Sequence, residues 1–242
     1  MMIKHTAFVK FRPELERAEA DRRWADEVGP LELVLPGLER YVQNTVVITT
    51  TNEGAVAGPP GFDGMTSMWF TDMGAFDAAL DSSEWAAAQR CAGAIFDPGW
   101  RGGGASAEIE ERVRRVGMGA RVDGISTPPG DPIKLVGLLR YREDLTRENA
   151  NNYWRTTPGR IALRIGAMGH YVQNHAIRGT GGRGVPAFDG FSEAWFADFE
   201  SYERSMASPE WSDLVADGPE LFDMSVFVSG IVRERVLKEL RP

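Results

Sequence analysis

The chain has few residues of the types that usually carry redox and metal chemistry. Its 242 residues include a single cysteine, Cys91, and three histidines, His5, His170 and His175. One thiol cannot form a disulfide within the chain, and no second thiol is present to build a thiolate metal site. The sequence therefore predicts neither a disulfide-stabilised domain nor a cysteine-based metal centre.

Long hydrophobic runs are also missing. No stretch of about 18 apolar residues occurs, so we expect no membrane-spanning helix and no membrane partner. The first residues, MMIKHTAFVKFRP, lack the apolar segment and the small-residue cleavage site of a signal peptide. These two observations together predict a cytoplasmic protein.

Basic charge is scarce as well. The chain has 27 Lys and Arg against 35 Asp and Glu, a formal net charge of −8. Nucleic-acid binding depends on clustered basic side chains that neutralise phosphates, so this balance predicts no nucleic-acid partner. A local exception, RVRR at 112–115, alternates Arg with Val and is typical of a strand with one solvated face.

The most informative property of the sequence is that it repeats itself. YVQN at 41–44 returns unchanged at 171–174, and Trp24 returns as Trp154 at the same offset. Four further segments return with substitutions: IKHTAFVKFR at 3–12 as IKLVGLLRYR at 133–142, FDGMTSMWF at 62–70 as FDGFSEAWF at 188–196, SSEW at 82–85 as SPEW at 208–211, and IFD at 95–97 as LFD at 221–223. This pattern indicates a tandem duplication.

Each half predicts the same succession of elements, strand–helix–strand–strand–helix–strand, which is the ferredoxin-like βαββαβ unit. In the first half we expect strands at 3–11, 41–50, 62–70 and 108–116, and helices at 13–35 and 74–92. In the second half we expect strands at 133–141 and 227–236, a helix capped by Thr146, and a helix at 199–216. A Gly- and Pro-rich linker at 122–131 separates the predicted domains 1–121 and 132–242.

A ferredoxin-like sheet has one face covered by helices and one bare face, and the bare face must be buried. Two copies in one chain can bury it against each other. The predicted fold class is therefore α+β, with two βαββαβ repeats packed sheet to sheet as a pseudo-dimer within the chain. A further homodimer is left open.

The repeated segments resemble the EthD-like branch of the dimeric α+β barrel superfamily. The resemblance rests on the IK-start strand, a Trp in the first helix, the LPGLERYVQN segment, the FDG…WF strand and the S-x-EW helix followed by FD. It covers nearly all of both halves and implies a small-molecule pocket. Members of the superfamily include polyketide cyclases, monooxygenases, isomerases and haem-handling enzymes, so the resemblance does not select a reaction. The His that EthD-like units carry after the helix-1 Trp is replaced by Val28 and Pro158, so its role cannot be transferred.

His5 is the sharpest catalytic candidate. Its repeat partner is Leu135, so packing does not require an imidazole there. In plant polyketide cyclases of the superfamily, a His on this strand acts as general acid/base and an aromatic residue of the first helix faces it. The resemblance implies these roles for His5 and Trp24, although the second pocket His of the cyclases falls near Trp85. A buried His bonded to a neighbouring carbonyl is the alternative.

His170 and His175 are further catalytic candidates on one predicted strand. Their separation of five positions puts the two side chains on opposite faces of a regular strand, so they cannot share a metal ion. The sequence predicts no metal site and no cofactor, while a haem held by one His stays open.

Tyrosine, asparagine and tryptophan residues complete the candidate site. Two tyrosines and two asparagines could donate hydrogen bonds to an oxygenated substrate: Tyr41, as a catalytic phenol, and Tyr171, Asn44 and Asn174. The alternative is that these repeated residues support the fold of both copies. Six of the seven Trp pair off across the repeats, which is typical of core packing, although aromatic walls also suit flat ligands. The candidates for binding substrate among them are Trp24, Trp69, Trp85, Trp154 and Trp195.

Three functions follow from these residues. We expect a cofactor-independent enzyme of lyase or isomerase type, which cyclises, dehydrates, decarboxylates or isomerises an aromatic or polyketide-like molecule with a His acid/base. One alternative is a cofactor-free monooxygenase on the same scaffold. The other is a non-catalytic protein that binds a small ligand unchanged.

Overall fold

The computed structural model of the chain describes residues 2–51, 54–55, 61–98, 106–115, 132–179 and 188–239. The predicted linker at 122–131 lies outside this part of the chain. We refer below to the described residues up to 115 as the first half and to those from 132 onward as the second half.

Both halves follow the predicted order of elements. The first half contains β1 (Ile3–Val9), α1 (Arg17–Arg23), a π-helical turn η1 (Trp24–Val28), α2 (Gly29–Leu33), β2 (Leu38–Thr51), β3 (Gly54–Ala55), β4 (Gly64–Phe70), α3 (Met73–Leu80), α4 (Ser83–Ala92) and β5 (Ser106–Arg115). The second half contains β6 (Ile133–Leu139), α5 (Arg147–Thr156), α6 (Pro158–Ala162), β7 (His170–Gly179), β8 (Gly190–Phe196), α7 (Phe199–Met206), α8 (Pro209–Leu221) and β9 (Val228–Lys238).

The prediction of one continuous helix at 74–92, and of another at 199–216, was wrong. Each is two helices, because a serine inside the predicted span caps a new helix. The hydroxyl of Ser82 accepts a hydrogen bond from the Trp85 amide at 3.1 Å, and Ser208 does the same for Trp211 at 3.1 Å. The predicted cap at Thr146 is confirmed, since its side chain accepts from the amide of Asn149.

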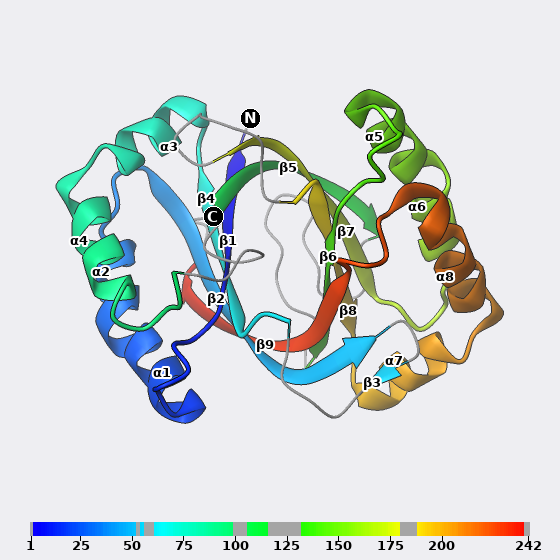
Figure 1. Cartoon of the computed structure of the whole chain (residues 1–242), viewed down its shortest axis with the longest axis horizontal. Coiled ribbons are helices and arrows are strands. Elements are labelled where there is room, and N and C mark those ends of the chain that lie inside the picture. Colours follow the sequence, from blue (N-terminus) through cyan, green and yellow to red (C-terminus); the bar gives the residue numbers. More distant parts are fainter. Residues whose placement is uncertain are drawn as a thin grey trace.

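The eight long strands close into a barrel. The sheet order is β3-β2-β4-β1-β5-β7-β8-β6-β9, and an additional pairing of β9 with β2 completes the ring. The two halves meet twice, at β5 with β7 and at β9 with β2, each time as antiparallel neighbours. Figure 1 shows the barrel in the centre, with α1–α4 on one side and α5–α8 on the other. The predicted intramolecular α+β barrel is therefore confirmed.

The repeated FDG segment has a structural explanation. The Asp63 carboxylate accepts the Phe11 amide at 2.8 Å and pairs with Arg17 at the start of α1. Gly64 leaves room for the Trp24 ring, because a Cβ there would lie 2.6 Å from its Cζ3 atom. The second half repeats both contacts with Asp189, Arg147, Tyr141, Gly190 and Trp154. The motif thus anchors the first helix of each half on its sheet.

The repeated IK and YVQN segments join the two halves. Lys4 donates to the Asn174 side chain at 3.1 Å, and Lys134 donates to the Asn44 side chain at 2.9 Å, so each lysine reaches the asparagine of the other half. All four side chains point into the barrel, where the exposed fraction of each is at most 2%. The segments recur because the contact between the halves is reciprocal.

Glu193 lies at the centre of this buried cluster. Its carboxylate binds both lysines at 2.5 Å and accepts from Asn174 at 3.0 Å. Burial alone would raise the pKa of Glu193, but the two ammonium groups outweigh burial and hold this pKa well below its usual range. Lys134 also pairs with Glu234 at 3.1 Å. The corresponding position in the first half is Ser67, so the cluster is not symmetric.

Candidate functional site

Each half has a pocket between its sheet and its helices, and the two pockets use equivalent positions. The first-half pocket is lined by His5, Glu32, Trp85 and Gln89, among other residues. The second-half pocket is lined by Leu135, Trp211 and Val215 at the positions of His5, Trp85 and Gln89. The candidate sites therefore lie on the helix-covered faces of the barrel wall, and the two copies differ mainly in polarity.

His5 projects from β1 toward α3 and α4. Its ring stacks on Phe76 with centroids 5.0 Å apart and meets the edge of Trp85 at 5.5 Å. Burial lowers the pKa of His5 to about 3, because no water solvates an imidazolium in this position. His5 is therefore a neutral imidazole near pH 7, able to donate or accept a hydrogen bond but poorly suited to hold an extra proton.

Glu32 is the ionisable group that suits proton transfer in this pocket. It lies on α2 with 4% of its surface exposed, and its carboxylate accepts a hydrogen bond from the Tyr41 hydroxyl. Gln43 donates to the Tyr41 oxygen at 2.8 Å and to the Trp24 carbonyl at 3.2 Å. Burial raises the pKa of Glu32 to about 7, although the Tyr41 hydrogen bond favours the ionised form. Burial, followed by the charge of Glu32, raises the pKa of Tyr41 well above its ordinary value, so Tyr41 stays protonated.

The raised pKa of Glu32 predicts a pH-dependent stability. An unfolded chain releases this proton near an ordinary pKa of about 4.3, whereas the folded protein holds it until about pH 7. The retained proton stabilises the fold fully below the unfolded pKa, and this contribution is lost as the pH rises through 7. Glu32→Gln cannot ionise, so its unfolding free energy relative to wild type should rise by about 3–4 kcal/mol between about pH 4 and pH 8. Urea unfolding across this range tests it, and a difference independent of pH would mean that Glu32 ionises normally.

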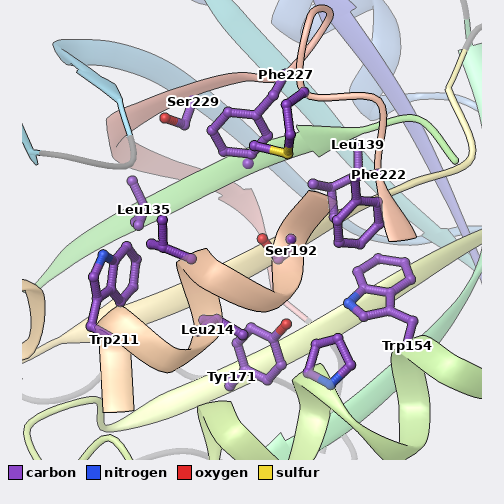
Figure 2. A pocket seen from close by; sticks show the side chains of 15 residues that line it. Leu135, Leu139, Trp154, Tyr171, Ser192, Trp211, Leu214, Phe222, Phe227 and Ser229 are labelled. Atoms are coloured by element: carbon purple, nitrogen blue, oxygen red, sulfur yellow. The ribbon is translucent and has the colours of Figure 1, made fainter. Parts of the chain in front are cut away.

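The second-half pocket is apolar and aromatic. Figure 2 shows Trp154, Tyr171, Trp211, Phe222 and Phe227 around one space, with Leu135 and Leu214 between them. The position of Glu32 is occupied here by Ala162, so this half has no counterpart of the carboxyl group. The pocket can hold an apolar ligand, but it has no titratable group matched to neutral pH.

Five of the predicted site residues lie elsewhere, inside the barrel. Trp69, Trp195, Asn44, Asn174 and His170 are buried on the interior face of the wall, opposite to the pockets. The asparagines bind the lysines of the cluster, and the rings of Trp69 and Trp195 lie 4.9 Å from the Lys4 and Lys134 ammonium groups, respectively. Since both faces of the wall are buried, sequence alternation alone cannot show which face holds the pockets. His170 was predicted as a catalytic residue and the other four as substrate-binding residues, but the structure places all five in the interior and outside both pockets.

The two late histidines lie on opposite faces of β7, as their odd separation predicts. His170 stacks on Trp195 with centroids 4.7 Å apart inside the barrel, and burial lowers its pKa to about 4. His175 lies on the helix side, 4.4 Å from the Trp154 ring and 2.9 Å from the Asn151 side chain. Neither lines a pocket with His5. Within the described ranges, no group of three or more His, Cys, Asp and Glu side chains is placed to hold a metal ion.

The remaining candidates divide between the halves. Trp85 lines the first-half pocket, while Trp154 and Tyr171 line the second-half pocket. Tyr41 lies behind Glu32 and donates its hydroxyl hydrogen bond to the Glu32 carboxylate. Trp24 is fully buried in the contact between α1, η1 and the sheet.

Sequence reasoning missed Glu32 and Gln89. A signal was available, because both differ between the copies, as Ala162 and Val215, in the same way as His5 differs from Leu135. Glu32 went unnoticed because it is one of several acidic residues in a predicted amphipathic helix. Only the packing of α2 on the sheet distinguishes it from the exposed ones.

Other structures show where this fold belongs. An anthrone oxidase-like protein has a TM-score of 0.64 and 10% identity, with 98% of this chain and 94% of that chain covered. A protein named as a candidate monooxygenase from Fusobacterium nucleatum has a TM-score of 0.54 and 12% identity, over 99% of this chain and 94% of that one. A candidate monooxygenase from Lactobacillus acidophilus has a TM-score of 0.52 and 10% identity, with 99% of this chain and 97% of that chain covered. At these identities the likeness shows the fold alone, a dimeric α+β barrel.

The sequence pattern of the EthD domain matches the chain twice, at residues 12–94 and 142–225. The two matches together span more than half of the sequence, so the chain belongs to the EthD domain family, as a tandem member. Both matches fall inside the proposed domains 1–121 and 132–242. No curated protein matches the chain. In the part of the chain that the structure describes, no helix has both the length and the apolar character to cross a membrane.

Proposed function

We propose that the chain is a cofactor-independent enzyme that removes a proton from an aromatic or polyketide-like small molecule bound in the first-half pocket. Cyclisation, dehydration and isomerisation of such molecules can all pass through the resulting enolate, whereas decarboxylation reaches an enolate by loss of CO2 and then takes up a proton. The observation that carries this proposal is Glu32, a buried carboxyl group in the pocket wall whose pKa is about 7. A general base works best when its pKa lies near the working pH.

Four polar residues at or behind the pocket wall take part in this mechanism. The Glu32 carboxylate accepts the proton as the substrate C–H bond breaks, and the electron pair moves onto the adjacent carbonyl as an enolate. His5, neutral because of its low pKa, donates its ring N–H to the enolate oxygen. Tyr41 and Gln43 hold the carboxylate in position. Glu32 returns the proton when the product forms.

A second candidate is a cofactor-free monooxygenase that begins with the same proton transfer. It is favoured by the structural likeness to an anthrone oxidase-like protein and to proteins named as candidate monooxygenases. Dioxygen would oxidise the carbanion, so that a CH2 group and O2 give a carbonyl group and water. The two candidates share Glu32 and differ in oxygen consumption.

Proton exchange measures the shared step directly. Anthrone, which has an acidic CH2 group next to its aromatic rings, is incubated with the protein in D2O without oxygen, and the loss of the CH2 signal is followed by NMR. We expect Glu32→Gln to slow the protein-catalysed exchange by about 100-fold or more, the usual share of a general base. Ala162→Gln places the same amide at the equivalent position of the second half and should leave the rate unchanged.

Exchange that is equally fast in wild type and Glu32→Gln would overturn the proposal. Admitting air then separates the two candidates. Exchange without oxygen uptake supports the proton-transfer enzyme, whereas oxygen uptake that depends on Glu32 supports the monooxygenase.

A further inference from the structure

The second-half pocket differs from the first in a consistent direction. At three positions of the pocket wall, an apolar residue of the second half stands where the first half has a group that can ionise or donate: Leu135 for His5, Ala162 for Glu32, and Val215 for Gln89. The exchange removes the means of proton transfer and leaves a wall suited to an uncharged ligand.

The second-half pocket also has open space that larger residues would fill. Gly137 and Gly218 stand where the first half has Ala7 and Ala92, and both glycines line the cavity. A Cβ at Gly218 would meet only Met224, at 3.5 Å, so an alanine would fit there. A protein core that has lost a site normally closes, because an unfilled apolar cavity is destabilising. Leu214, in place of Ala88, adds apolar surface without closing the space.

The shape of the wall indicates the kind of ligand. Trp154 meets Phe222 edge-on with centroids 5.6 Å apart, and Trp211 lies across the cavity with Leu135 and Leu214 beside it (Figure 2). An open cavity with aromatic and aliphatic walls suits flat aromatic ligands. The polar atoms of the lining come from neutral groups, such as the Ser192 hydroxyl, so they can bind a ligand hydroxyl or carbonyl but offer no countercharge.

We propose that the second-half pocket is a separate binding site for a neutral, flat molecule of two or three fused aromatic rings, which it holds without chemical change. This inference does not rest on the proposed function, because it concerns the half that lacks Glu32 and His5. Together with the proposed function, the inference gives the chain one pocket that converts its ligand and one that only binds it.

Binding of 1-naphthol, a neutral two-ring probe, tests the inference by isothermal titration calorimetry on the full chain. Val215→Trp places an indole in the second-half pocket, and Gln89→Trp places the same indole at the equivalent position of the first. We expect Val215→Trp to weaken binding by about tenfold or more, equal to about 1.4 kcal/mol. Gln89→Trp should leave a second-half site with unchanged affinity.

Gly218→Leu is the second filling variant, chosen because the helix backbone at Gly218 accepts a side chain and only Met224 lies near it. It should weaken binding as Val215→Trp does, and thermal unfolding confirms that both variants are folded. Naphthol binding that survives both variants, or that is lost in Gln89→Trp alone, would overturn the inference. Proton exchange on anthrone should show the reverse pattern, with loss in Gln89→Trp and retention in Val215→Trp, so a failure of either proposal can be recognised separately.

Discussion

Glu193→Gln is expected to lower the unfolding free energy by about 3–5 kcal/mol, the usual loss when one partner of a buried ion pair is removed. The substitution keeps the shape of the side chain but leaves the ammonium groups of Lys4 and Lys134, both nearly fully buried, without the carboxylate that binds them at 2.5 Å. Urea unfolding at neutral pH measures the effect.

The matched control is Glu200→Gln, which removes a carboxylate that binds Arg204 at the same distance of 2.5 Å on the surface. Exposed pairs of this kind contribute at most about 1 kcal/mol. A loss in Glu193→Gln no larger than in Glu200→Gln would show that the interior cluster does not hold the halves together.

Gly190→Ala is expected to destabilise the fold by about 3 kcal/mol or more, at the upper end of overpacking in a core. Its Cβ would lie 2.6 Å from Cζ3 of Trp154 and closer still to the backbone oxygen of Asn174. The strand backbone cannot move away, because β7 and β8 are paired along this stretch. The shift in unfolding midpoint by circular dichroism measures the cost.

Two other glycines calibrate that result. Gly64→Ala meets the equivalent Trp24 ring at 2.6 Å and should be similarly damaging, whereas Gly166 has open space and should tolerate alanine. Equal midpoints for Gly190→Ala and Gly166→Ala would contradict the assigned role of the FDG glycine.

The sequence predicted the fold because the duplication makes every element appear twice. The paired segments identified the strands and the first helix of each half. The intramolecular barrel was predicted because the uncovered face of each sheet must be buried. The sequence could also have predicted the division into α3 and α4 and into α7 and α8, since Ser82 and Ser208 precede helix-forming residues in both copies. The strand pairs between the halves, β5 with β7 and β2 with β9, could not, because nothing local in a strand specifies a distant neighbour.

The candidate site was less predictable. His5 was found by its difference from Leu135, and that comparison applied throughout would have found Glu32 as well. Asn44 and Asn174 could not be assigned to the interior from the sequence. Both faces of the barrel wall are buried, so the alternation of side chains along a strand does not show which of them face the interior. The pKa values of His5 and Glu32 depend on burial by helices whose docking is known only from the fold.

The asymmetry of the interior cluster has a consequence for partner choice. Two first halves brought together would enclose two Lys4 ammonium groups with two Ser67 hydroxyls and no Glu193 carboxylate. Two second halves would enclose the Glu193 carboxylate twice. Only the mixed pair places one Glu193 between Lys4 and Lys134, as it stands in this chain. The first half therefore has no carboxylate of its own at this position for Lys4, and it depends on the second half to supply Glu193.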